Sequence, residues 1–235
     1  MQTHALQTLQ SSLEELSAML QERQPNYKDA PVRINPFPLN TAIFIIYMCV
    51  TSRTALKERT TMSNNDEELL CKAYDLAFKY EANYGSCPQC VLRALHEVFC
   101  FKMDEVIKSS HPLAGGTALS GEGTCGALLG GIMAIGFMHG RELKDMDKGR
   151  FLKSYTLAKR LYDRFVKEFG SCLCKEVQKK IFGRSFNLWD SEDFKEFERM
   201  GGHRDKCPDV SGKVARWAAE ILFEEMNKTK GTKHE

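Results

Sequence analysis

The sequence has little excess charge and lacks the length of apolar residues that a membrane span requires. Its 33 Lys and Arg residues nearly balance 31 Asp and Glu residues, which leaves a formal charge of +2. That balance gives no reason to expect a nucleic acid or an anionic membrane as a partner. The apolar run at residues 41–50 is about half the length of a membrane-spanning helix. We therefore expect no membrane span and interpret this run as a buried segment.

Strand patterns and a secretory signal are missing as well. No segment alternates apolar and polar residues strongly enough to predict a strand, and the N-terminus has neither the basic nor the apolar region of a signal peptide. The sequence nevertheless holds nine cysteines, an odd number. Since disulfide frameworks belong to secreted proteins, we expect free thiols in a reducing compartment, the cytoplasm.

Residues 1–61 differ in pattern from the rest of the chain. They combine a leucine stripe of helical spacing at residues 3–22, a linker with four of the seven prolines, and the apolar arm. Met62 then stands directly before a good helix start. One hypothesis is that Met62 is the initiator and that the preceding residues are an upstream extension; the alternative is a family-specific N-terminal helix and arm. Either way, we predict a separate helical four-cysteine domain over residues 62–230.

Amphipathic periodicity predicts helices throughout that domain. The expected helical segments are 64–85, 88–101, 124–140, 151–170, 171–183, 191–202 and 208–226. Segment 124–140 is nearly uncharged and rich in glycine, so it should be the buried central helix. Its small side chains would let another backbone or a cofactor come close. The predicted fold class is all-α, a compact multi-helix bundle.

Four cysteines lie at or near the start of a predicted helix: Cys87, Cys125, Cys174 and Cys207. Helix N-termini carry unpaired N–H groups and a partial positive charge, which favour a thiolate and lower the cysteine pKa. Thiolates are the ligands of iron, zinc and iron–sulfur clusters. If the four helix starts met in space, they would surround a four-thiolate centre.

The segments around these cysteines resemble a known family. They read YGSCPQCVLRAL, GEGTCGALLGGIMAIG, FGSCLCKEV and KCPDVSGKVARWAAEIL, within residues 66–225. They are similar to the redox-active family named for its signature C…GCAxxG…C…C. Matched residue by residue, the signature falls on Cys87, Cys125, Cys174 and Cys207, with Ala127 and Gly130 completing the middle motif. The order of Gly and Cys differs from the family label, since Cys125 here precedes Gly126.

The resemblance implies a redox role more than a reaction. The family occurs in bacteria and archaea that often live without oxygen, and a similar domain occurs in split-Soret cytochromes, which carry haem and an iron–sulfur centre. We therefore expect an electron-transfer or redox-sensing protein with an iron–sulfur cluster on the four signature cysteines. Its redox partner is unknown, and a homodimer that shares ligands across its interface is one arrangement considered.

Three other residues are secondary ligand candidates: Cys90, Cys172 and His203. Cys90 forms a C-x-x-C with Cys87, Cys172 lies two residues before Cys174, and His203 lies four residues before Cys207. Two alternatives stay open. A structural zinc site in a helical interaction module would also use four thiolates, although zinc ligands usually come in close pairs. A thiol–disulfide oxidoreductase would use one of the two cysteine pairs.

Overall fold

The structure is a computed structural model that describes residues 64–231 of the chain. The chain divides into two units, residues 1–57 and 58–235, and all described residues belong to the second. The predictions for residues 1–61, including the leucine stripe, the proline linker, the apolar arm and the Met62 start, lie outside the described residues.

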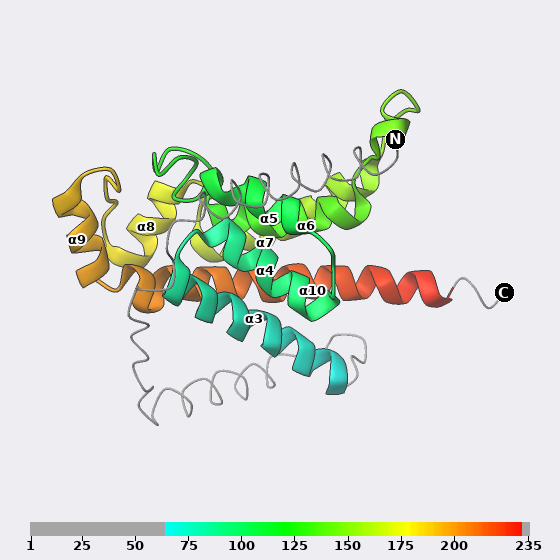
Figure 1. The fold of residues 1–235 in the computed structure, drawn as a ribbon, viewed down its shortest axis with the longest axis horizontal. Helices are drawn as coiled ribbons and strands as arrows, with labels where there is room; N and C mark the ends of the chain where they lie inside the picture. Colours follow the sequence, from blue (N-terminus) through cyan, green and yellow to red (C-terminus); the bar gives the residue numbers. More distant parts are fainter. Residues whose placement is uncertain (1–63, 232–235) are drawn as a thin grey trace, which may run out of the picture. The chain divides into compact units, whose positions relative to one another are not determined.

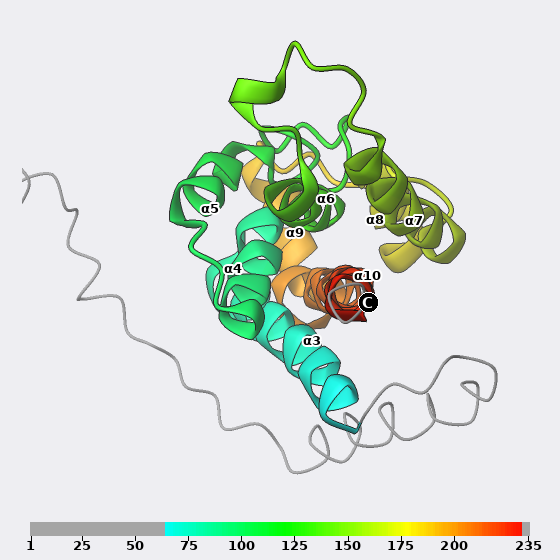
Figure 2. The ribbon, with the colours of Figure 1, turned by 90° about the vertical axis from the view of Figure 1, so that its right-hand side faces the viewer.

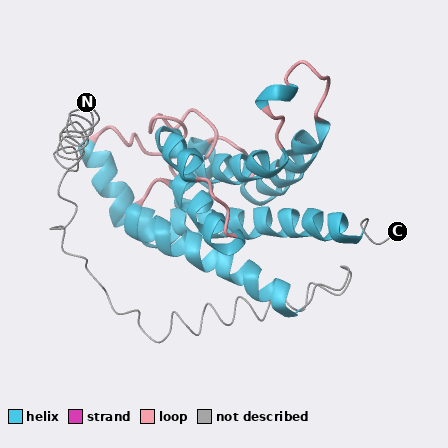
Figure 3. Cartoon of the chain, turned by 45° about the vertical axis from the view of Figure 1, so that its right-hand side comes forward, coloured by secondary structure: helices cyan, strands magenta, loops and turns pink. Residues whose placement is uncertain are grey.

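Eight α-helices make up the described part, which contains no strand (Figure 3). They are α3 (Asn64–Tyr84), α4 (Cys87–Phe99), α5 (Asp104–Ser110), α6 (Gly126–His139), α7 (Leu152–Phe169), α8 (Cys174–Phe182), α9 (Ser191–Arg199) and α10 (Cys207–Gly231). Short 3-10 turns η1 (His111–Leu113) and η2 (Leu143–Asp145) lie in the loops, and a π-helical turn η3 (Gly202–Lys206) leads into α10. The all-α prediction is confirmed. None of these helices is long and apolar enough to cross a membrane.

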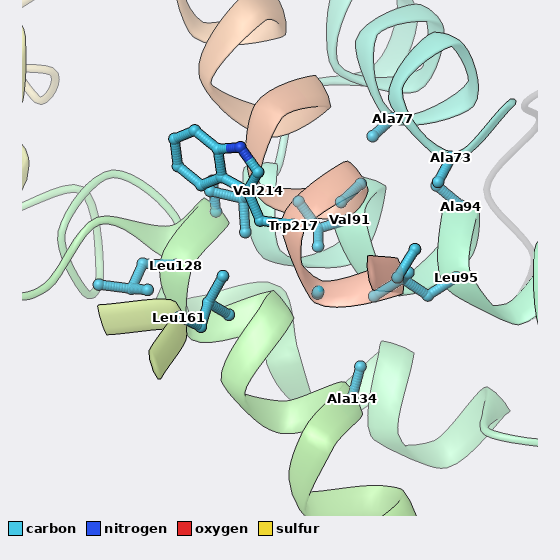
Figure 4. Close-up of a cluster of buried hydrophobic side chains, with 14 of the residues drawn as sticks. Ala73, Ala77, Val91, Ala94, Leu95, Leu128, Ala134, Leu161, Val214 and Trp217 are labelled. Atoms are coloured by element: carbon cyan, nitrogen blue, oxygen red, sulfur yellow. The ribbon is translucent and has the colours of Figure 1, made fainter. Parts of the chain in front are cut away.

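Helix α10 runs through the bundle and packs against α3, α4, α6 and α7. Figure 2 looks along α10 and shows these helices around it, and in Figure 1 α8 and α9 lie at the end where α10 begins. The core joins Val214 and Trp217 of α10 to Leu128 of α6 and Leu161 of α7, all buried (Figure 4). Burial of one such aliphatic side chain stabilises the fold by about 1.5–3 kcal/mol.

The glycine-rich helix α6 is buried over most of its length because its neighbours approach its backbone closely. A Cβ atom at Gly130 would lie 2.7 Å from the carbonyl oxygen of Pro88 on α4. One at Gly131 would lie 2.7 Å from the Leu161 side chain on α7. Gly130 therefore needs glycine because backbone faces it, whereas a side chain at Gly131 would require Leu161 to shift. The close helix packing that the sequence indicates is present.

Candidate metal centre

All four signature cysteines stand at helix starts, as predicted. Cys87, Cys174 and Cys207 are the first residues of α4, α8 and α10, and Cys125 is the N-cap of α6. Pro88 and Pro208, which directly follow two of them, suit a first helical turn because proline lacks the N–H that would stay unpaired there. Four helix N-termini are thus set beside the four thiols, although the first N–H groups of α8 already have backbone acceptors, as Lys175 does in the Gly121 carbonyl.

A single antiparallel β-bridge joins the starts of α6 and α8. Thr124 pairs with Leu173. The backbone N–H of Cys125 donates to the Cys172 carbonyl over 2.8 Å, and the N–H of Cys174 donates to the Gly123 carbonyl over 2.9 Å. These bonds hold Cys125 and Cys174 beside each other although 48 residues separate them in the sequence. The sequence pattern gave no sign of this contact, since a bridge of one residue pair has no alternation.

The four cysteines line one pocket of about 240 Å³. It lies where the starts of α4, α6, α8 and α10 meet the end of α3 and the turn η3. Its polar wall also includes Glu81, Ser86, Gln178, His203 and Ser211. Within residues 64–231, no three Cys, His, Asp or Glu side chains are grouped so as to hold one metal ion. The four cysteines nevertheless line the same pocket.

A left-handed backbone segment closes one side of this pocket. Five successive residues, from Gly115 to Leu119, have φ values between 49° and 75°. Each non-glycine residue among them costs roughly 1–2 kcal/mol in this conformation. The indole N–H of Trp189 donates to the Ala118 carbonyl over 2.8 Å and helps to hold the segment. The segment places the N–H of Gly115 on the sulfur of Cys87.

Burial raises the pKa of all four thiols, against the prediction that the helix starts lower it. For Cys125 burial raises the pKa to about 11, even though the N–H groups of Ala127 and Leu128 favour the thiolate. The pKa of Cys87 rises mainly through burial and further through the nearby Glu81, despite the Gly115 N–H. The prediction is wrong because loss of hydration outweighs the backbone N–H groups. A bound cationic centre would reverse the balance, since it stabilises thiolates directly.

Three buried oxygen atoms of the pocket wall have no hydrogen-bond partner within the described residues. They are Oε2 of Glu81 and the hydroxyl oxygens of Ser86 and Ser211. Unpaired buried polar atoms are rare in folded proteins and commonly mark a bound water, ion or ligand. Three of them on one pocket indicate a polar occupant.

Two of the three secondary candidates are not lining residues of the pocket. The Cys90 thiol donates to the Gly85 carbonyl over 2.8 Å, and Cys172 contacts the Tyr162 hydroxyl at 3.5 Å. Neither lines the pocket, whereas His203 does. Among the other cysteines, Cys71 is half-buried and Cys100 is exposed. Cys49, the remaining one, lies outside the described residues.

The polar pocket residues that the sequence did not single out include Glu81 and Gln178. Glu81 lies four residues after Ala77 on the stripe that buries Ala73 and Ala77, so its helical position was an available signal. Gln178 is 2 % exposed; its amide N–H approaches the Cys174 sulfur at 3.9 Å and its oxygen accepts from the Phe186 N–H at 2.9 Å. No sequence signal marks Gln178, because it lies in a helix rich in polar residues.

Comparison with known proteins places the chain in one family. A family model described as "Putative redox-active protein (C_GCAxxG_C_C)" matches residues 85–221, which contain all four pocket cysteines. Searches of curated proteins and of solved structures found no match. The matched segment spans more than half of the chain. The chain therefore belongs to the redox-active protein family that carries the C_GCAxxG_C_C cysteine signature.

Proposed function

We propose that this protein is an electron-transfer or redox-sensing protein with an iron–sulfur cluster bound by Cys87, Cys125, Cys174 and Cys207. The observation that carries the proposal is the shared pocket, to which four helix starts from distant parts of the chain each contribute one thiol. All four come from one chain, so the site needs no second copy for its ligands.

The remaining pocket residues fit such a group. Cluster sulfides accept hydrogen bonds, and the hydroxyl groups of Ser86 and Ser211 are unpaired donors on the pocket wall. The N–H groups of Gly115, Ala127 and Leu128 point at ligand sulfurs. When bound, the cluster would supply one-electron chemistry. The chain's own part is to exclude water and to stabilise the negative charge with these donors.

The pocket supports a centre of several atoms over a single zinc ion. Zinc draws its sulfur ligands to about 2.3 Å from one point, whereas no three Cys, His, Asp or Glu side chains of residues 64–231 are grouped closely enough to hold one ion. A reducing compartment such as the cytoplasm suits the proposal, because the four pocket cysteines form no disulfide with any described residue.

The direct test is anaerobic purification of the full chain, followed by iron and sulfide analysis, a visible spectrum and electron paramagnetic resonance of the reduced protein. Cys174→Ser should lose the cluster, while Cys172→Ser, two residues away and outside the pocket, should keep it. Zinc in place of iron would support the structural alternative. A protein that stays colourless and metal-free after reconstitution would overturn the proposal.

A further inference from the structure

Three side chains connect the cysteine pocket to the protein surface. Glu198 on α9 is hydrogen-bonded to Nδ1 of His203, and its side chain is 39 % exposed. Nε2 of the same imidazole lies 3.9 Å from Oε1 of Glu81. Glu81 is 2 % exposed and lines the pocket with the four cysteines. The order from solvent to pocket is therefore carboxylate, imidazole, carboxylate.

The fold holds His203 in place through unusual backbone geometry. His203 lies in the π-helical turn η3, which starts after Gly201 at a φ of 96°. π-Helical turns are rare and often occur at functional sites. Gly202 packs so closely on the Phe197 ring that a Cβ atom there would collide with it. The centroid of the Phe197 ring lies 5.2 Å from that of the His203 imidazole, and the two rings meet edge-on. This contact and the packing of Gly202 on Phe197 fix the orientation of the imidazole.

Glu81 is suited to hold a proton beside the pocket. Burial raises its pKa to about 7, against the opposing influence of His203 and Cys90. The ionisable groups that face it are Cys87 and Cys90 of α4, Cys125 of α6, Cys174 of α8, His203 of η3 and Cys207 of α10. His203 is the basic group of this set, so protons can reach Glu81 through it. The 3.9 Å gap between the two exceeds a hydrogen bond, so proton transfer across it requires the imidazole and the carboxyl group to move closer together.

We propose that Glu198, His203 and Glu81 form a proton path between solvent and the cysteine pocket, with His203 as the carrier. His203 accepts a proton at Nδ1 from the Glu198 carboxyl group, which regains it from water, and releases the proton on Nε2 to Glu81. The coupling of this path to electron transfer rests on the proposed function. Each electron that a one-electron donor delivers to the pocket is matched by one proton that Glu81 accepts.

Pairing electron and proton has a clear physical benefit in this place. An added negative charge in a buried pocket is costly because little water screens it. A proton that arrives at Glu81 with the electron leaves the net charge of the pocket unchanged. Glu81 lies outside the family match, which begins at residue 85, whereas His203 and Glu198 lie within it.

The path can be tested without any bound metal. Below pH 7 the Glu81 carboxyl group holds its proton, and its infrared C=O band is identified by its loss in Glu81→Gln. Rapid mixing of the metal-free protein with D2O then gives the rate at which this proton exchanges. We expect His203→Gln to slow exchange at least tenfold and Glu198→Gln to slow it less. Glu196→Gln, which changes a half-buried carboxylate on the same helix that pairs with Arg199, should leave the rate unchanged.

Further experiments distinguish proton transfer by His203 from a merely structural role of this residue. The Glu81 proton should also exchange slowly in His203→Ala, and free imidazole should restore the exchange rate. A merely structural role of His203 would not predict this rescue. Unchanged exchange in both His203→Gln and Glu198→Gln would overturn the path, and circular dichroism identifies a variant that has not folded. In the iron-loaded protein, the reduction potential should fall as the pH rises, and Glu81→Gln should remove this dependence. A dependence that survives in Glu81→Gln would reject the coupling, while absence of iron would reject the proposed function and leave the exchange result standing.

Discussion

Gly126 on α6 touches the sulfur of Cys87 on α4: a Cβ atom at Gly126 would stand 2.6 Å from that sulfur and 2.9 Å from the Pro88 ring. We therefore predict that Gly126→Ala displaces the Cys87 thiol from the pocket. Iron bound per chain after anaerobic reconstitution should fall several-fold, although alanine is the better helix former by about 1 kcal/mol.

Gly136 provides the matched control on the same helix. A Cβ atom there meets nothing within 4 Å, so Gly136→Ala should raise the free energy of unfolding by about 0.5–1 kcal/mol. Its iron content should stay at the wild-type level. Equal iron content in both variants would contradict the close contact between Gly126 and Cys87.

Gln178 links the Cys174 sulfur to the backbone N–H of Phe186. Gln178→Leu would leave that buried N–H without an acceptor, which costs about 1–3 kcal/mol. Urea unfolding of the metal-free protein should show this loss. Lys179→Leu changes an exposed neighbour whose ammonium group pairs with Glu176 of the same helix, so it should change stability by less than about 0.5 kcal/mol. A similar loss in both variants would count against the role of Gln178.

The stability of the metal-free protein should depend on pH through Glu81. Its folded pKa of about 7 exceeds the reference value of 4.5, so folding favours the protonated form. This contribution is complete below about pH 4.5 and is lost as the pH rises through about 7. The difference between wild type and Glu81→Gln, measured by urea unfolding over this range, isolates the contribution. A pH-independent difference would contradict the raised pKa.

The pocket thiols should react slowly with alkylating reagents. Only thiolates are alkylated, and burial raises the pKa of all four pocket cysteines. In metal-free protein at about pH 8, mass spectrometry of iodoacetamide-treated samples should show exposed Cys100 labelled at least tenfold faster than the four pocket cysteines. Equal labelling of Cys100 and Cys125 would show that the pocket opens to solvent.

The helices were predictable because the apolar periodicity and the local end signals agree. One such end signal is Asp190, the N-cap of α9, whose carboxylate accepts hydrogen bonds from the N–H groups of Glu192 and Asp193. The short helix α5 was missed because seven residues, Asp104–Ser110, are too few to show periodicity. The helix-start positions of the signature cysteines also followed from the sequence.

The site was less predictable, because its properties depend on tertiary contacts. The rise in the pKa of Cys125 comes from residues that surround its sulfur in space. The bridge between Thr124 and Leu173 and the π-helical turn at His203 likewise have no periodic signal. That the four cysteines act as ligands stays a prediction, as does the identity of the centre.

The bridge between Thr124 and Leu173 constrains two of the four pocket cysteines more than the other two. Backbone hydrogen bonds at the bridge fix the spacing of Cys125 and Cys174, whereas Cys87 and Cys207 each begin a separate helix. A centre would thus bind first to Cys125 and Cys174, whose positions are already fixed, and then to Cys87 and Cys207. Amide protons at the first turns of α4 and α10 should consequently gain more protection from loading than those of the bridge.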